Sequence, residues 1–284
     1  MIKAKQLALS AGILVACVSA TAPAYADNGR LLATGAASTI EGASGGGIVP
    51  WATLSSYASE NQWGATVALG EVQVDDFRLS VQGASLTYGN RVEVSYANQV
   101  FDLKTIGGEL KQDIFGLKVR AFGDLIYGDL PQVSVGLQHK RNRTFDLPQT
   151  VGAADDSGTD VYISAAKAWL DGPFHRTWLV NLTARATKAN QLGLLGFGGD
   201  KDDDYSIQAE ASVAMFINRK LAVGVEYRQK PDNLGFAREE DWYDAFVAYF
   251  PTKSLSIVGA YTDLQSIAGL DDQDGFYLSL QGTF

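Results

Sequence analysis

The sequence predicts an all-β fold: an antiparallel transmembrane β-barrel of about 12 strands, with short periplasmic turns and long external loops. Segments in which apolar and polar residues alternate recur along the whole chain. The connections between these segments are alternately short and long, which is typical of outer-membrane barrels. No stretch after residue 26 is long and apolar enough for a membrane helix, although 46% of the 284 residues are hydrophobic.

Residues 1–26 have the pattern of a secretory signal peptide. Two lysines precede an apolar run over residues 7–20, and Ala24-Tyr25-Ala26 forms a small-residue cleavage site. The run is shorter than the ~20 apolar residues that a membrane anchor needs. A second processing route stays open, because Leu14-Val15-Ala16-Cys17 resembles a lipoprotein signal in which the cysteine is acylated.

Cleavage after Ala26 leaves a mature chain without cysteine, so no disulfide framework is expected. Removing Lys3 and Lys5 leaves 21 basic residues against 32 acidic ones, a net charge of −11. This charge argues against a nucleic-acid partner.

A Gly/Ala/Ser-rich segment, residues 27–46, precedes the barrel, which we expect to occupy 47–284. Two interpretations stay open for this segment. It folds into the lumen as a plug, or it is a flexible periplasmic leader.

Twelve strands are expected, and the strand at 219–229 has the cleanest alternation. Leu221, Val223 and Val225 share one face, and Ala222 and Glu226 share the other. The complete set is 47–58, 76–88, 91–103, 112–123, 130–141, 158–169, 175–187, 205–217, 219–229, 240–250, 254–263 and 274–284. The first and sixth of these alternate poorly, and totals of 10 or 14 strands stay open.

The connections divide into two series that alternate along the chain. The short ones are 89–90, 124–129, 170–174, 218 and 251–253, and the long ones are 59–75, 104–111, 142–157, 188–204, 230–239 and 264–273. An even number of strands places both termini on the periplasmic side.

The last strand ends the chain on an aromatic residue and carries the pattern of an assembly signal. Phe276, Leu278, Leu280 and Phe284 share the face expected to meet lipid. This pattern predicts the barrel-assembly machinery as a partner. Closure requires this strand to pair with the first one, because lipid offers no partner to a free edge.

Charged residues on the polar faces are expected to line the lumen, where they stay hydrated. The predicted basic residues are Arg78, Arg91, Lys118, Arg120, Lys140, Arg185 and Arg228, and the acidic ones are Glu93, Glu210, Glu226 and Asp244. Seven basic residues against four acidic ones predict that the lumen weakly prefers anions. The alternative is that these charges pair with one another and fill a narrow barrel.

Three segments also resemble a proteobacterial family known as domain of unknown function 3034. They are GRLLATGAASTIEGASGGGIVPWATL near the mature N-terminus, GASLTYGNRVEVSYANQVFDL and YGDLPQVSVGLQHK. The resemblance covers nearly the whole mature chain and implies an exported, outer-membrane protein. It implies no activity, substrate or catalytic residue.

From these observations we expect a passive, weakly anion-preferring channel for small solutes in the outer membrane of a Gram-negative bacterium. A non-conducting structural barrel that interacts through its surface is the alternative, and an outer-membrane hydrolase is a third and less favoured interpretation. Lipid and lipopolysaccharide are the expected surroundings. We expect no enzyme, cofactor or metal site, because the two histidines, His139 and His175, lack a catalytic motif and the acidic loop at 198–205 lacks the EF-hand pattern.

Overall fold

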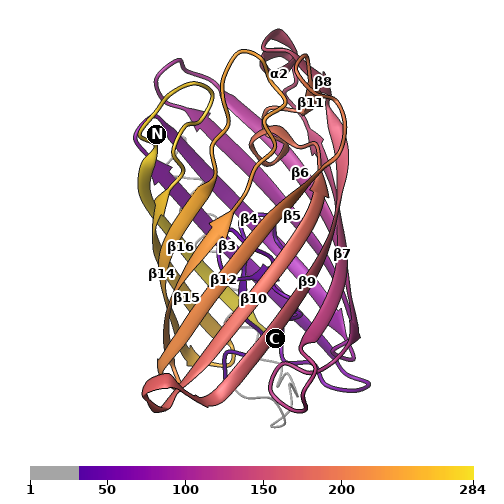
Figure 1. Cartoon of the computed structure of the whole chain (residues 1–284), viewed down its shortest axis with the longest axis vertical. Helices are drawn as coiled ribbons and strands as arrows, with labels where there is room; N and C mark the ends of the chain where they lie inside the picture. Colours follow the sequence, from indigo (N-terminus) through magenta and orange to yellow (C-terminus); the bar gives the residue numbers. More distant parts are fainter. Residues whose placement is uncertain (1–31) are drawn as a thin grey trace.

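A computed structural model describes residues 32–284 of the chain. The predicted signal peptide, Cys17 and residues 27–31 lie outside the described residues. Twelve strands form one closed antiparallel barrel in the order β10-β12-β13-β14-β15-β16-β3-β4-β5-β6-β7-β9 (Figure 1). The predicted fold class and the number of barrel strands are therefore confirmed.

The barrel strands are β3 Trp63–Val74, β4 Phe77–Tyr88, β5 Val92–Leu103, β6 Glu109–Phe122, β7 Gln132–Asn142, β9 Ser157–Gly172, β10 Arg176–Thr187, β12 Ser206–Asn218, β13 Leu221–Arg228, β14 Trp242–Thr252, β15 Leu255–Asp263 and β16 Asp274–Thr283. The short elements are β1 Ala37–Ser38, β2 Ser44–Gly45, α2 Asp146–Thr150, β8 Ala153–Asp155, η1 Pro173–His175, η2 Asn190–Gly193 and β11 Phe197–Gly199.

Alternation along each strand separates the two faces of the wall. In β13, Val225 is 55% exposed on the outside, whereas the next residue, Glu226, is 3% exposed on the inside. Successive side chains point to opposite faces of a strand, so one apolar series covers the outside of the barrel. Within residues 32–284, no helix is long and apolar enough to cross a membrane.

The first predicted strand, 47–58, is wrong. The first barrel strand is β3, and residues 47–58 instead lie inside the barrel, where they are buried. The long external loop predicted at 59–75 is wrong as well, because β3 and β4 are joined by the two residues Asp75 and Asp76. The other five loops on that side are longer, and two of them carry α2, β8 and β11 at one end of the barrel (Figure 1).

The C-terminal strand closes the barrel against β3. Leu278 pairs with Glu71 in this ladder, and the Phe284 and Ala65 backbones exchange N–H···O bonds of 2.8 and 2.9 Å. Phe276 and Leu278 are 70% and 61% exposed on the outer face. The predicted closure between the last and first strands is therefore present, with a different first strand.

Aromatic side chains lie at both ends of the outer face. At the periplasmic end, the rings of Trp63 and Tyr88 are 4.8 Å apart; at the external end, those of Tyr227 and Tyr243 are 5.2 Å apart. Such belts are typical of the two lipid–water interfaces. Phe77 and Phe101, by contrast, stack on each other inside the barrel.

Candidate functional site: a lumen filled by a plug

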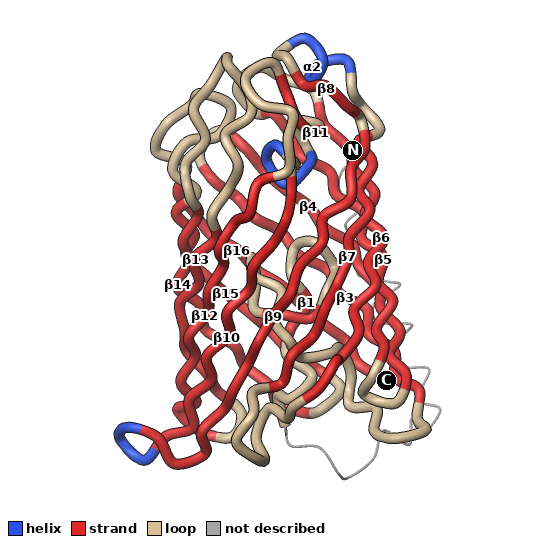
Figure 2. Tube along the Cα trace, turned by 45° about the vertical axis from the view of Figure 1, so that its right-hand side comes forward, coloured by secondary structure: helices blue, strands red, loops and turns tan. Residues whose placement is uncertain are grey.

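The lumen contains a continuous segment, residues 35–58, which we call the plug. Every residue of the plug is buried, and the short β1–β2 hairpin lies within it, inside the barrel wall (Figure 2). The glycines of the plug allow this close packing. A Cβ at Gly46 would lie 2.1 Å from Glu226 Oε1, and one at Gly45 would lie 2.2 Å from the Val49 carbonyl oxygen.

Glu41 connects the plug to three cations of the wall. Its carboxylate lies 2.7 Å from Arg228 and 3.3 Å from Arg185, and it also pairs with Lys140. These cations come from β13, β10 and β7. Burial alone would raise the pKa of Glu41, but Arg185, Arg228 and Lys140 together hold this pKa well below its usual value. Glu41 is thus a buried anion with three cationic partners.

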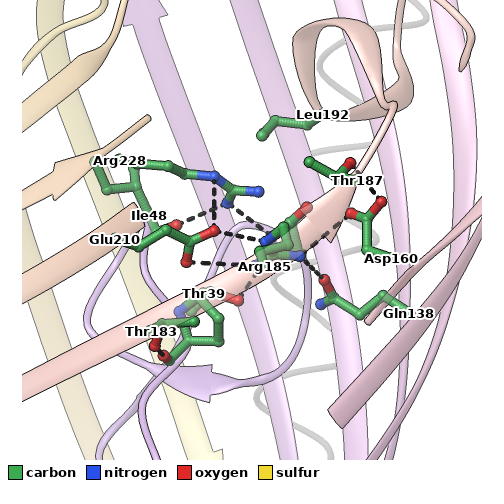
Figure 3. Close-up of polar contacts among 12 residues, drawn as sticks. Thr39, Ile48, Gln138, Asp160, Thr183, Arg185, Thr187, Leu192, Glu210 and Arg228 are labelled. Carbon is green, nitrogen blue, oxygen red and sulfur yellow. Dashed lines mark hydrogen bonds and ion pairs between the residues drawn. The ribbon is translucent and has the colours of Figure 1, made fainter. Parts of the chain in front are cut away.

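The wall supplies further partners for the same cations. Arg185 lies 2.5 Å from Glu210 and 3.2 Å from Asp160, and its guanidinium also donates to Gln138 at 2.7 Å (Figure 3). Arg228 donates to the Ile48 carbonyl oxygen of the plug at 2.8 Å. Because every one of these groups is buried, the network is shielded from water and salt.

Two wall carboxylates bind plug backbone directly. Glu226 accepts N–H groups of Gly47 and Ile48 at 2.7 and 2.8 Å. Glu93 accepts those of Ser44 and Ser55 at 3.1 and 2.6 Å. The wall thus satisfies backbone groups that the short β1–β2 hairpin and the Gly45–Pro50 bridge of the plug leave unpaired.

Lys118 adds a cation to the second of these contacts. It donates to the Ser44 and Thr53 carbonyl oxygens at 2.8 and 3.0 Å and lies 3.7 Å from Glu93. A wall cation and a wall anion therefore hold the same turn of the plug.

The wall has two chemically different halves. From β7 to β12 it presents polar side chains, several of which bind the plug at Pro50 and Ala52: Gln132, Ser134, Ser164, Asn181 and Thr183. From β3 to β6 its external half is apolar and forms a core with Ile40 and Ile48 of the plug. That apolar group comprises Val72, Val74, Phe77, Leu79 and Phe101.

External loops cover the plug from outside the cell. Leu192 and Leu194, in the loop that carries η2, and Ile267, in the last loop, are all buried. The cavity left between plug, wall and loops measures about 20 Å³, which is room for a single water molecule. On the periplasmic side a larger cavity of about 810 Å³ opens below the plug, beside Leu179 and Phe216.

The structure places eight of the predicted lumen residues inside the barrel, each with at most 5% of its surface exposed: Glu93, Lys118, Lys140, Arg185, Glu210, Glu226, Arg228 and Asp244. Arg120 lies at the periplasmic end, where it bonds Asp124 at 3.0 Å.

Two predicted lumen residues lie elsewhere. Arg78 points outward and pairs with Glu71. Its ladder partner Gln73 also pairs with Phe276 on the next strand, so Arg78 lies level with the external aromatic belt. Water and lipid headgroups reach this level, so a charge can point outward there. Arg91 lies in the exposed turn between β4 and β5 and donates to the Arg120 carbonyl oxygen.

Sequence reasoning missed two lumen acids, Glu41 and Asp160. Glu41 lies in the plug, which has no strand alternation, and Asp160 lies in the strand whose alternation was poor. With these two included, the buried central lumen holds four basic residues against six acidic ones: Lys118, Lys140, Arg185 and Arg228 against Glu41, Glu93, Asp160, Glu210, Glu226 and Asp244. The excess of basic residues predicted from sequence is therefore not present in the filled lumen.

Both histidines lie outside the lumen. His139 points outward and its Nδ1 lies 3.0 Å from the Thr159 hydroxyl; His175 is exposed at a periplasmic turn beside Asp171.

A closed antiparallel barrel with an apolar outer face, two aromatic belts and a polar interior defines the class of transmembrane β-barrels found in bacterial outer membranes. Within that class, the chain belongs to the family described as "Protein of unknown function (DUF3034)", whose model matches residues 34–281. The resemblance seen in the sequence is thereby confirmed. No curated protein matches the chain.

Solved structures of the same architecture include two porins and a phospholipase. The NanC porin is 13% identical, with a TM-score of 0.47 over 78% of this chain and 98% of that one. The KdgM porin is 8% identical, with a TM-score of 0.48 over 77% and 99%. Outer membrane phospholipase A from Escherichia coli is 10% identical, with a TM-score of 0.41 over 78% and 91%. These likenesses are confined to the barrel fold.

Proposed function

We propose that the protein is a passive outer-membrane channel for small solutes whose lumen is closed by the plug. The observation that carries this proposal is the polar wall from β7 to β12. A permanent protein core would be stabilised by apolar side chains, yet Asn181, Thr183, Ser134 and Gln138 are all completely or almost completely buried in it. Such a wall is suited to water once the plug has moved.

The energetics of the plug contacts agree with a removable closure. Buried ion pairs contribute little net stability, because desolvation of both ions offsets most of their attraction. If the plug leaves, water rehydrates Lys140, Arg185 and Arg228 and takes over their hydrogen bonds. An apolar contact of the same area would gain no such compensation when the plug leaves, because water does not form favourable contacts with exposed apolar side chains.

The same geometry supports a weak anion preference in the open lumen. At the level of Glu41, plug removal leaves Lys140, Arg185 and Arg228 facing only Asp160 and Glu210. At this level the cations would be in excess by one, and a ring of positive charge favours the passage of anions.

Planar-bilayer recording of the purified protein tests the proposal, with a variant that lacks residues 35–58 as the comparison. We expect the full chain to stay closed for most of the recording and the deletion variant to give frequent steps. In a salt gradient, the reversal potential of those steps should indicate a weak preference for anions. Cation preference would contradict the selectivity, and a properly folded deletion variant without any conductance would contradict the channel.

A non-conducting barrel is the second candidate, favoured by the filled lumen and by the external loops packed over the plug. In that case the acidic external loops make the functional contacts, and lipopolysaccharide is the partner whose phosphates they would reach through divalent cations. This candidate predicts a silent deletion variant together with loop-dependent binding to lipopolysaccharide.

Export through a cleaved signal peptide and insertion by the barrel-assembly machinery belong to the same proposal. The outward face of β16 supports this proposal. Phe276, Leu278 and Leu280 form an apolar face along the last strand, which a membrane-inserting machine can recognise. We also propose that the protein is not an enzyme, in agreement with histidines that lie apart from the plugged lumen.

A further inference from the structure

Three oxygen-bearing side chains form a row across neighbouring strands inside the barrel. Glu226 of β13 pairs directly with Asp244 of β14, which in turn pairs directly with Thr262 of β15. All three point into the lumen and are 3%, 5% and 0% exposed. Directly opposed residues in an antiparallel sheet have neighbouring Cβ atoms, so the three groups lie close together.

Glu226 accepts hydrogen bonds from four groups around it. Its carboxylate accepts the backbone N–H groups of Gly47 and Ile48, the indole N–H of Trp51 at 3.2 Å and the Ser212 hydroxyl at 2.6 Å. Backbone and indole N–H groups can only donate, so both carboxylate oxygens of Glu226 serve them as acceptors.

Asp244 and Thr262 lack partners in the same place. Neither carboxylate oxygen of Asp244 accepts a hydrogen bond of ordinary geometry, and the Thr262 hydroxyl has no hydrogen-bond partner. Within residues 32–284, no lysine or arginine forms an ion pair with Asp244 or Glu226. Two ionised carboxylates that oppose each other in a buried site repel each other unless a positive charge lies between them.

The two carboxylates approach the same turn of the plug. Asp244 Oδ2 and Glu226 Oε2 each lie 3.5 Å from the position that a Cβ on Gly47 would take.

We propose that Glu226, Asp244 and Thr262 form a binding site for a hard, oxygen-liganded cation. Two carboxylates are neutralised by a divalent ion, and an irregular set of carboxylate, hydroxyl and water oxygens suits Ca²⁺ better than Mg²⁺, which demands octahedral geometry. The site adjoins the Gly46–Gly47 turn of the plug, so the bound ion stabilises the contact between plug and wall.

Terbium luminescence and thermal unfolding test the site on the purified, refolded full chain. Tb³⁺ replaces Ca²⁺ and is sensitised by nearby aromatic rings, and Trp51 lies against Glu226. We expect saturable Tb³⁺ emission that Ca²⁺ displaces, and a higher unfolding temperature in Ca²⁺ than in chelator. Asp244→Asn should weaken binding on the order of tenfold or more.

Two further variants separate this site from general effects of acidic surface. Thr262→Val should weaken Tb³⁺ binding without a change of charge, whereas Asp271→Asn, in an exposed external loop, should leave it unchanged. In chelator, Asp244→Asn should unfold at a higher temperature than the wild type, since it removes the carboxylate repulsion. The proposal is overturned if wild type and Asp244→Asn respond equally to Ca²⁺ and to Tb³⁺, or if neither responds.

Discussion

At the scale of single residues, the carboxylate of Glu41 lies between cations that three separate strands contribute. Lys140, Arg185 and Arg228 could all be predicted as inward residues from the alternation of their strands. Glu41 could not, because a plug residue obeys no strand period and its partners are distant in sequence. Ion pairing therefore determines where the plug sits, while alternation determines which wall residues are available to it.

Replacing Glu41 by Gln should loosen the plug. It leaves buried cations without one of their counter-ions, which typically costs about 3 kcal/mol or more. We expect a lower urea midpoint in detergent and more frequent channel opening. Glu109→Gln, which alters an exposed pair with Lys111, is the control and should change neither. Equal behaviour of the two variants would contradict the role given to Glu41.

The depressed pKa of Glu41 also predicts a pH dependence. A carboxylate whose pKa is lower in the folded state stabilises that state fully above its ordinary value of 4.5, and the stabilisation is lost as the pH falls below this value. Opening should therefore increase in acid, below about pH 4.5, and Glu41→Gln should remove this part of the dependence. Single-channel recording across this range would measure it.

A substitution at Gly46 tests by steric means how tightly the plug packs against the wall. Gly46→Ala places a methyl group 2.1 Å from Glu226 Oε1, so either the turn or the Glu226 carboxylate must shift, and their hydrogen bonds are disturbed in both cases. We expect increased conductance and faster proteolysis of the plug. Gly259→Ala is a matched control, because a Cβ there meets nothing within 4 Å. Indistinguishable variants would show that the turn is not tightly seated.

At the scale of elements, β3 explains why the first strand was predicted in the wrong place. Above the lipid, its inward residues Val72 and Val74 are apolar and its outward residues Glu71 and Gln73 are polar, which reverses the pattern of a membrane strand. Residues 47–58 read as an apolar segment because the lumen buries them on every side. The local sequence shows the two-residue period of a strand, but it does not show whether each face of the strand meets lipid, water or the plug.

The outward series of β14 offers a test of the lipid-facing surface. Val247 is 49% exposed, between Tyr243 and Tyr249 on the same face. An arginine there would meet hydrocarbon and should lower the free energy of unfolding by about 2–4 kcal/mol in lipid vesicles. Asp271→Arg, in an external loop, should be close to neutral. A neutral Val247→Arg would place this face away from lipid.

At the scale of the whole molecule, closure, strand number and strand order could be predicted from the sequence, because each depends on alternation and on paired edges. The filling of the lumen could be predicted only as one of two alternatives. It depends on contacts such as Glu41 with Arg228 and Ser55 with Ser85, which join distant parts of the chain. The charge balance of the lumen changed only in part for this reason. The plug contributes Glu41, but the wall contributes Asp160, and Arg78, Arg91 and Arg120 lie outside the central lumen.

The central claim is that a movable plug closes an otherwise hydrated lumen, and a reversible disulfide tests it most directly. The hydroxyls of Ser55 in the plug and Ser85 in β4 are 2.8 Å apart, and cleavage after Ala26 would leave no native cysteine to interfere. In planar bilayers, the variant carrying Ser55→Cys and Ser85→Cys should give no steps when oxidised and should recover opening events when a reductant is added. Identical conductance in both redox states, with the disulfide verified, would contradict the claim.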